Sequence, residues 1–434
     1  MRNIRRRARS IRRLLGSTAI GTILVGTAMY ANFQADDYFG MVKSDWTVTR
    51  ASTGYAENLA GVLQSFGSNV LRRTDKGVLI EPSSTNLLLQ SQTLGTTWTV
   101  SNGSVSSDVT TAPDGTTTAD VFVENSAAAS PHGINQTITA ASNVNYVFSM
   151  YFKLRDTARP WVRMYVDDNA GTNYINAYFN VQTGVVGTVA NNGTATGAAG
   201  RIQALANGWY RCVLAGKCST VNTSSVRVLV RTTNADNVQT TNGDGVSGMF
   251  MWGAQLEADI VESSYIVTTT GTVTRAADAI TITGATLTKW YTAGPGTIFV
   301  RFLSPRANGS NNRFVFALGD NSTNNRVVIF VNTSNQLGYR VAAGGVAHLT
   351  AGTNLKTAGN EVKAVISWQV GSQLGSDDGN NAVTASGATN PTVDRLQLGQ
   401  DDGGGANRLL GWIEYIEYSP APIDAATAKV ISAP

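Results

Sequence analysis

Hydrophobic and polar residues alternate with a period of two along many short segments of this chain. Tyr146, Phe148, Met150 and Phe152 alternate with small or polar residues, which is the pattern of a strand that buries one face. Clusters of Asn, Gly, Asp and Ser separate these segments, and no stretch longer than a turn or two has a helical period. The pattern predicts a first series of strands at residues 120–124, 145–154, 161–166, 174–181, 209–214, 226–232 and 248–256.

A second series of strands is predicted nearer the C-terminus, at residues 297–302, 312–318, 326–331, 338–341, 361–368, 395–399 and 410–418. We therefore expect an all-β protein of two consecutive antiparallel β-sandwiches. The expected domains span residues 86–278 and 279–434, and residues 36–85 precede them as lead-in strands and a linker.

Composition agrees with this pattern. The chain has 44 Gly residues and only 14% charged residues, which is typical of strand-rich proteins with many tight turns rather than of helical enzymes. A hydrophobic fraction of 42% excludes an unfolded chain.

The net charge of +4 is misleading, because seven of the 33 basic residues are arginines among the first thirteen positions. The remainder has 26 basic and 29 acidic residues, so the composition does not support a nucleic-acid-binding fold. The uncharged stretch Leu14–Ala31 follows the arginines. Three interpretations of residues 1–35 remain open: a flexible basic docking arm, a signal peptide cleaved near Ala28 or Ala31, and a short membrane anchor.

Two cysteines, Cys212 and Cys218, do not make a disulfide framework. On one continuous strand they would share a face but lie too far apart to bond, whereas a hairpin between them would allow a bond. Unpaired thiols are the favoured interpretation. His132 and His348 are too far apart in the sequence for a His/Cys metal site of ordinary spacing.

Candidate catalytic and metal-binding carboxylates are few. Glycoside hydrolysis needs two carboxylates about 5 to 9.5 Å apart across a cleft. Glu414 and Glu417 are the candidate catalytic pair. Residues three apart on a regular strand point to opposite faces, however, so we expect no enzyme activity. Asp401-Asp402, followed by three Gly residues, is a candidate calcium loop, although turn chemistry is the favoured explanation. No other cofactor is predicted.

A candidate carbohydrate-binding face lies on two of the predicted strands. Sugars present apolar C–H faces edged by hydroxyl groups, which suit aromatic rings with polar neighbours. Three residues share one face of the strand at 161–166, and three share one face of the strand at 174–181. They are Trp161, Arg163, Tyr165, Tyr174, Asn176 and Tyr178. If this face were the sandwich core, burial of the arginine and the asparagine would be costly, so we predict a binding surface.

Several phrases, taken in order, resemble a family of bacteriophage and prophage virion proteins. They are Thr49–Gly54, Gly77–Glu81, Thr85–Leu88, Met251–Glu257, Ser264–Ile266 and Val273–Asp278. Members of that family are tail-fibre or head-spike proteins with a carbohydrate-binding-type jelly roll, which the resemblance implies for residues 86–278. A second set of pieces resembles the concanavalin A-like, laminin G-type sandwich that often closes such proteins, which the resemblance implies for residues 279–434. These pieces are Gly296–Val300, Val362–Ile366, Asp394–Gly399 and Gly411–Tyr418.

Two local expectations follow from the resemblance. A short helix follows the last strand in the family, and Asp424 supplies an N-cap for it here. The chain departs from the family pattern at residues 371–385, where a simple hairpin turn is usual, so we expect a modified rim loop.

We therefore expect a non-catalytic virion adhesin, a phage head spike or tail fibre, that contacts host surface polysaccharide. Its expected partners are host glycans and, through the N-terminal arm, other virion proteins. A homo-oligomer is expected because many weak sugar contacts gain from multivalency. The alternatives are a polysaccharide depolymerase on the virion, a purely structural decoration protein, and a secreted or cell-surface bacterial protein.

Overall fold

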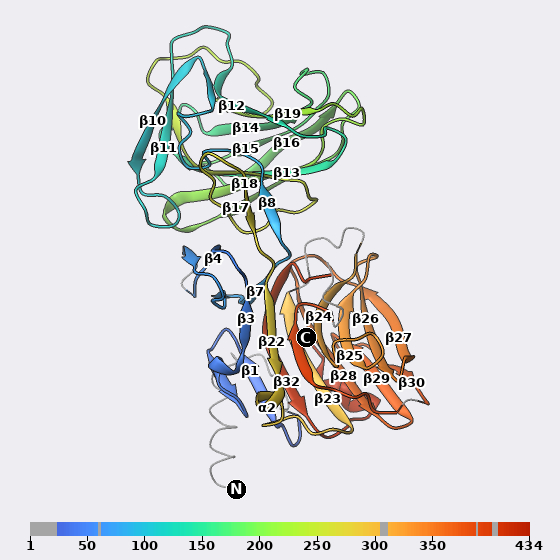
Figure 1. The fold of residues 1–434 in the computed structure, drawn as a ribbon. Helices are drawn as coiled ribbons and strands as arrows, with labels where there is room; N and C mark the ends of the chain where they lie inside the picture. The colour runs from blue at the N-terminus through green and yellow to red at the C-terminus, as the bar shows by residue number, and fades with distance from the viewer. Residues whose placement is uncertain (1–23, 60–61, 304–310, 388, 402–406) are drawn as a thin grey trace. The chain divides into compact units, whose positions relative to one another are not determined.

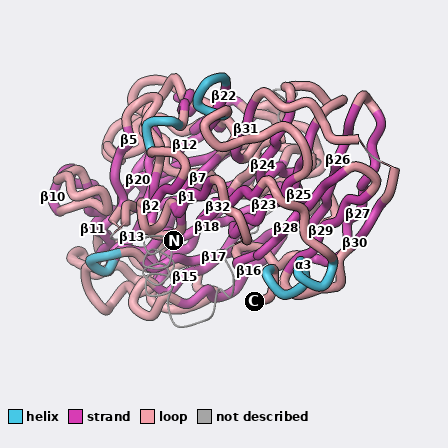
Figure 2. Tube along the Cα trace, turned by 90° about the horizontal axis from the view of Figure 1, so that it is seen from below, coloured by secondary structure: helices cyan, strands magenta, loops and turns pink. Residues whose placement is uncertain are grey.

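The computed structural model describes residues 24–59, 62–303, 311–387, 389–401 and 407–434. Within these ranges nearly all regular structure is β-strand in antiparallel sheets (Figure 1), which confirms the prediction of an all-β fold. The described helices are short: the 3-10 helices Lys43–Asp45 and Ala206–Gly208, α2 (Gly284–Leu287) and α3 (Ala425–Ile431). They are the small cyan segments in Figure 2. None of the described helices has the length and apolar character needed to cross a membrane.

The chain folds into two compact units. As far as the residues are described, unit 1 contains residues 24–51, 68–82 and 277–434, and unit 2 contains residues 52–67 and 83–276. Residues 36–85, expected as lead-in strands and a linker, are thus divided between the units. The sandwiches are interleaved in the sequence, because unit 2 is inserted between segments of unit 1.

Unit 2 is a sandwich of two antiparallel sheets. Its main strands are β9 (Thr99–Ser101), β10 (Gly103–Thr110), β11 (Ala119–Glu124), β12 (His132–Thr139), β13 (Asn145–Leu154), β14 (Trp161–Asp167), β15 (Tyr174–Asn180), β16 (Val185–Asn192), β17 (Thr196–Ala204), β18 (Trp209–Lys217), β19 (Ser225–Thr233) and β20 (Gly248–Glu257). One sheet has the order β10-β11-β20-β13-β18-β17, and the other has the order β16-β15-β14-β19-β12-β9. Two short pairs complete the unit: β4 (Gly54–Glu57) with β5 (Leu63–Phe66), and β8 (Ser84–Asn86) with β21 (Val273–Arg275).

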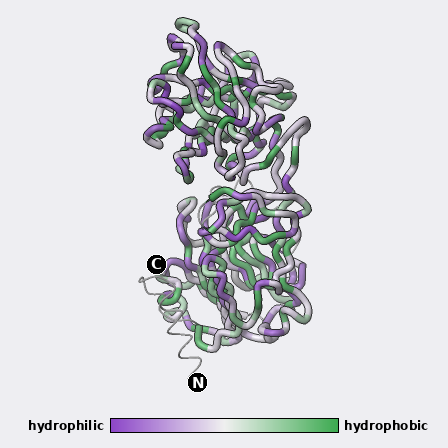
Figure 3. Tube along the Cα trace, turned by 90° about the vertical axis from the view of Figure 1, so that its left-hand side faces the viewer, coloured by the Kyte–Doolittle hydropathy of each residue, from purple (hydrophilic) through white to green (hydrophobic). Residues whose placement is uncertain are grey.

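The core of unit 2 lies between its two sheets. Phe148 and Met150 of β13 and Val162 and Met164 of β14 belong to one buried cluster. The period of two along these strands decides which side chains enter it. Hydrophobic (green) and hydrophilic (purple) positions are interspersed along the trace in Figure 3.

Unit 1 is the second sandwich. The strands of its larger sheet are β1 (Met29–Asn32), β2 (Asp37–Phe39), β6 (Arg73–Thr74), β7 (Gly77–Ile80), β23 (Gly296–Leu303), β28 (Glu361–Gln369), β29 (Ser372–Asp377), β30 (Val383–Ala385) and β32 (Gly411–Ser419). The strands of its other sheet are β3 (Thr47–Thr49), β22 (Ala279–Thr283), β24 (Arg313–Gly319), β25 (Arg326–Val331), β26 (Gln336–Ala343), β27 (Val346–Leu355) and β31 (Arg395–Leu398). Their orders are β2-β1-β32-β23-β28-β29-β30, with β7 also beside β32, and β27-β26-β25-β24-β31-β22-β3.

Strands from the N-terminal part of the chain complete both sheets of unit 1. β1 and β7 pair with β32, and β3 pairs with β22. β1 falls within the segment expected as an arm or signal sequence, whereas residues 1–23 of that segment lie outside the described residues.

The prediction of a rim loop at residues 371–385 is wrong. β29 pairs with β28, and β30 pairs with β29, so the segment extends the sheet. Its Gly, Ser and Asp residues concealed the strand pattern, yet Gly375 is needed there, because a Cβ would lie 2.3 Å from the ring of Tyr339. The predicted N-cap is present: Asp424 accepts a hydrogen bond from the backbone N–H of Thr427 at 2.7 Å, and α3 follows.

Candidate functional site

The six residues predicted to bind carbohydrate lie on two neighbouring strands of unit 2. β14 and β15 pair antiparallel, with Arg163 directly opposite Tyr178. The alternate residues of β14, such as Val162 and Met164, enter the core, and none of the six does. They lie on the opposite side of the sheet, which we call the outer face.

Arg163 lies at the centre of the outer face and is only 2% exposed. Its Nε and Nη2 atoms donate to Asn176 Oδ1 at 3.1 and 2.6 Å. Its Cζ atom lies 4.8, 5.6 and 5.5 Å from the ring centroids of Tyr165, Tyr174 and Tyr178. Three π faces and an amide oxygen therefore hold this cation, and no carboxylate in the described part of the chain pairs with it.

The tyrosines form one side of the outer face. The rings of Tyr165 and Tyr174 have centroids 4.4 Å apart and planes inclined by 31°. Tyr178 is buried, and its hydroxyl has no hydrogen-bond partner among the described residues. Burial raises the pKa of both Tyr165 and Tyr178, so these hydroxyl groups keep their protons and can donate.

Trp161 forms the other side. A Cβ on Gly187 of β16 would lie 2.6 Å from Trp161 Cζ3 and 2.4 Å from Asp236 Oδ1. The glycine therefore allows the indole and the carboxylate to lie against β16. Asp236 is fixed there, because the backbone N–H and the hydroxyl of Thr188 both donate to it at 2.9 Å.

Two arginines of β19, which were not predicted, extend the outer face. Arg227 and Arg231 lie opposite Asp167 and Arg163 of β14, respectively. Arg227 Nη2 is 2.6 Å from Asp167 Oδ2. Arg231 is partly buried, and within the described residues it makes no hydrogen bond or ion pair. Burial, and then the charge of Arg163, lower its pKa.

These arginines were visible in the sequence only in part. Alternation along residues 226–232 places Arg227 and Arg231 on one face, since Val228 and Val230 belong to the core. The pairing of β19 with β14 brings that face beside Arg163, and this order of strands has no local signature in the sequence.

The prediction that Glu414 and Glu417 point to opposite faces is wrong. The register of β32 against β23 shifts at this point, and Ile413 and Ile416 are both in the core of unit 1. Glu414 therefore occupies a β-bulge, which places it on the same side as Glu417. Its Oε2 atom is 2.6 Å from Arg301 Nε, on the side of the sheet away from the core.

Both carboxylates are buried in unit 1 rather than displayed on a cleft. Glu417 accepts hydrogen bonds from the Leu24 backbone N–H and the Tyr415 hydroxyl, both at 3.1 Å, and from the Thr27 hydroxyl. Glu417 is 3% exposed and Glu414 is 5% exposed. Burial raises the pKa of each to about 7. Their partners belong to the packing of the unit.

The metal and thiol predictions have different outcomes. Among the described residues no group of three or more His, Cys, Asp or Glu side chains is placed to hold a metal ion. Asp401 accepts a hydrogen bond from Asn407 at 3.3 Å, but Asp402 lies outside the described residues, so the calcium loop stays a prediction.

Cys212 and Cys218 are buried and unpaired, as favoured, and burial raises the pKa of Cys218 to about 12.

No protein-family model matches the chain, and no curated protein matches it. Among solved structures, the CBM40 domain of the Ruminococcus gnavus IT-sialidase, bound to α2,6-sialyllactose, is 11% identical with a TM-score of 0.29, over 33% of this chain and 85% of that one. Domains LG4-5 of the mouse laminin α1 chain are 11% identical with a TM-score of 0.24, over 69% and 88%. A heptameric pentraxin from Limulus polyphemus is 12% identical with a TM-score of 0.26, over 32% and 70%.

Proposed function

We propose that this chain is a non-catalytic adhesin that binds surface polysaccharide through the outer face of unit 2. The observation that carries the proposal is the setting of Arg163, a nearly buried arginine held by three tyrosine rings on the side of the sheet away from the core. Trp161 and Tyr174 are only partly buried beside it. Partly exposed aromatic rings suit the apolar faces of sugars, and the guanidinium and amide groups suit their hydroxyl groups.

The proposal places the adhesin on a phage or phage-derived particle, as a head spike or tail fibre whose ligand is host surface polysaccharide. Support for this setting is the ordered series of phrases that resembles virion proteins, from Thr49–Gly54 to Val273–Asp278. Other virion proteins are its proposed partners, and a homo-oligomer would multiply weak sugar contacts. The virion location is tested by labelling purified phage particles with an antibody against this chain. Unlabelled particles would overturn the virion location and favour a secreted or cell-surface protein.

Binding is tested with the full-length chain on an array of bacterial capsular and O-antigen polysaccharides. We expect binding that falls at least tenfold in Trp161→Ala and Tyr174→Ala and persists in Trp412→Ala, a matched control on β32 of unit 1. Released reducing ends are measured on the same polymers. Equal loss in all three variants, or no binding to any polymer, would overturn the adhesin, and released reducing ends would replace it with a depolymerase.

A further inference from the structure

Two arginines face one another on the outer face, and no described carboxylate lies in an ion pair with either of them. Arg163 and Arg231 are directly opposite partners in the ladder between β14 and β19. Like charges at directly opposite positions of an antiparallel pair destabilise the sheet. Here the repulsion acts on an arginine that is almost fully buried and one that is partly buried, where water screens it less than at an exposed site.

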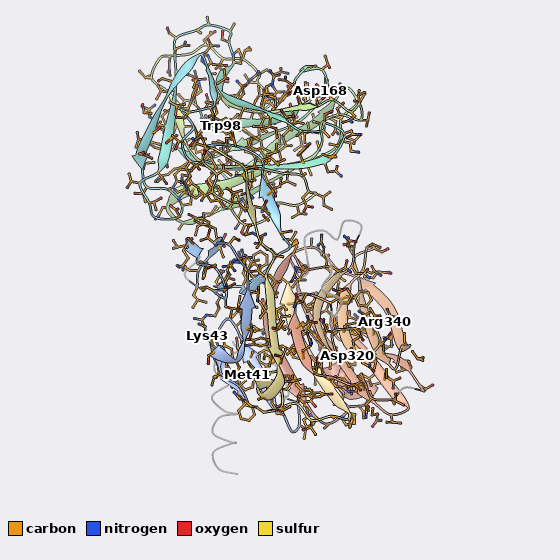
Figure 4. The ribbon with its side chains drawn as sticks, in the orientation of Figure 1. Met41, Lys43, Trp98, Asp168, Asp320 and Arg340 are labelled. Carbon is orange, nitrogen blue, oxygen red and sulfur yellow. The ribbon has the colours of Figure 1, made fainter. Side chains whose placement is uncertain are left out.

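The carboxylates on this face, and Asp168 just after β14, have partners other than Arg231. Asp167 pairs with Arg227 at 2.6 Å, and Asp236 accepts both hydrogen bonds of Thr188. Asp168, labelled in Figure 4, accepts from Asn173 Nδ2 at 2.6 Å and from the backbone of Ala170 at 3.2 Å. None of these carboxylates pairs with Arg231. Within the described part of the chain, a partly buried guanidinium with no counter-ion therefore remains beside the aromatic rings.

We propose that the polysaccharide bound here is acidic and that a carboxylate of one of its sugars lies between Arg163 and Arg231. This inference rests on the proposed function and names its ligand class. A carboxylate between two guanidinium groups removes their repulsion and accepts several charge-assisted N–H bonds. Tyr178 lies opposite Arg163, and its buried hydroxyl has no hydrogen-bond partner among the residues that the structure describes, so it supplies a further donor. The sugar ring then lies against Tyr165 and Tyr174.

The test uses three uronate polymers, polygalacturonate, alginate and hyaluronate, each paired with the same polymer reduced at its carboxyl groups to a neutral form. Dextran and dextran sulfate test whether a sulfate replaces the carboxylate. Binding to the full-length chain is measured by affinity electrophoresis at two salt concentrations, because exposed charge attraction weakens with salt. The variants are Arg231→Gln, Arg231→Lys and, as the matched control, Arg340→Gln on β26 of unit 1 (Figure 4).

We expect at least one uronate polymer to bind, and carboxyl reduction to weaken it at least tenfold. Arg231→Gln should cause a similar loss without a lower melting temperature, because it removes a repulsion; Arg231→Lys should bind at an intermediate level. Arg340→Gln should bind as the unchanged chain does. Three outcomes would overturn the proposed carboxylate contact and still leave an adhesin. They are equal binding of the reduced polymers, an equal loss of binding in Arg340→Gln, and binding of dextran sulfate but of no uronate polymer. If the chain binds no polymer in this test and none on the bacterial array, both proposals are overturned.

Discussion

Arg50 Nη1 lies 2.9 Å from Asp278 Oδ1, and both side chains are almost completely buried in unit 1. Arg72 donates to the other carboxylate oxygen of Asp278 and also lies 2.6 Å from Glu81 Oε2. The two guanidinium groups and two carboxylates thus neutralise one another away from water. Arg50, Glu81 and Asp278 come from three of the phrases that resemble virion proteins. These phrases are Thr49–Gly54, Gly77–Glu81 and Val273–Asp278. Their charges therefore stabilise the fold rather than hold a ligand.

Removal of the Asp278 charge should strongly destabilise unit 1. Asp278→Asn removes the carboxylate that both Arg50 and Arg72 contact, and loss of one partner of a buried ion pair costs about 3 to 5 kcal/mol. Urea unfolding followed by tryptophan fluorescence measures it. The control is Asp394→Asn, because Asp394 pairs with Arg395 at an exposed site. A loss in Asp278→Asn no larger than that of the control would contradict the role assigned to this network.

Sequence patterning located most strands and the shared outer face, because burial repeats every second residue within a strand. β13 and β25 begin and end at the predicted residues. Three features had no such local signal. The pairing of β1 with β32 joins residues almost four hundred apart, the position of Arg231 beside Arg163 depends on strand order, and the side of Glu414 depends on a bulge. Each of these is decided by a partner strand rather than by the strand's own sequence.

A side chain at Gly187 should weaken polysaccharide binding by displacing Trp161. The added Cβ of Gly187→Ala would lie 2.6 Å from the indole and 2.4 Å from Asp236. We expect at least a fivefold loss of affinity on the polysaccharide array. Gly271→Ala is the control in the same unit, since no described atom other than its chain neighbours lies within 4 Å of its added Cβ. Unchanged affinity in Gly187→Ala would place the binding surface away from Trp161.

The phrase Met251–Glu257 should be structural, because its polar side chains are buried in a hydrogen-bond network. Gln255 accepts from the Ile266 backbone N–H and donates to Glu257, both at 2.7 Å. Gln255→Ala leaves buried groups without partners, and each costs about 1 to 3 kcal/mol. We expect a loss in this range in urea unfolding, with binding per folded molecule retained.

The matched control for this network is Gln182→Ala, which changes an exposed glutamine of the same unit. Its stability should remain within about 0.5 kcal/mol of the unchanged chain. If Gln255→Ala unfolds at the same urea concentration as Gln182→Ala, the network contributes no stability. If instead it abolishes binding at full stability, the phrase belongs to the binding site.

Glu417 should make unit 1 less stable as the pH rises. Burial raises its pKa from 4.5 to about 7 in the folded protein. Between these values the folded state holds a proton that the unfolded state has released, so the free energy of unfolding falls as the pH rises through this window. The full cost, about 3 kcal/mol, is present above pH 7 and absent below pH 4.5.

Glu417→Gln removes this titration, so the stability of the unchanged chain relative to this variant should decrease from pH 5 to pH 8. Urea unfolding at each pH measures the difference, with Asp394→Asn as the control for loss of one negative charge at an exposed site. Parallel profiles for the unchanged chain and Glu417→Gln would show that the buried carboxylate titrates alike in the folded and unfolded states.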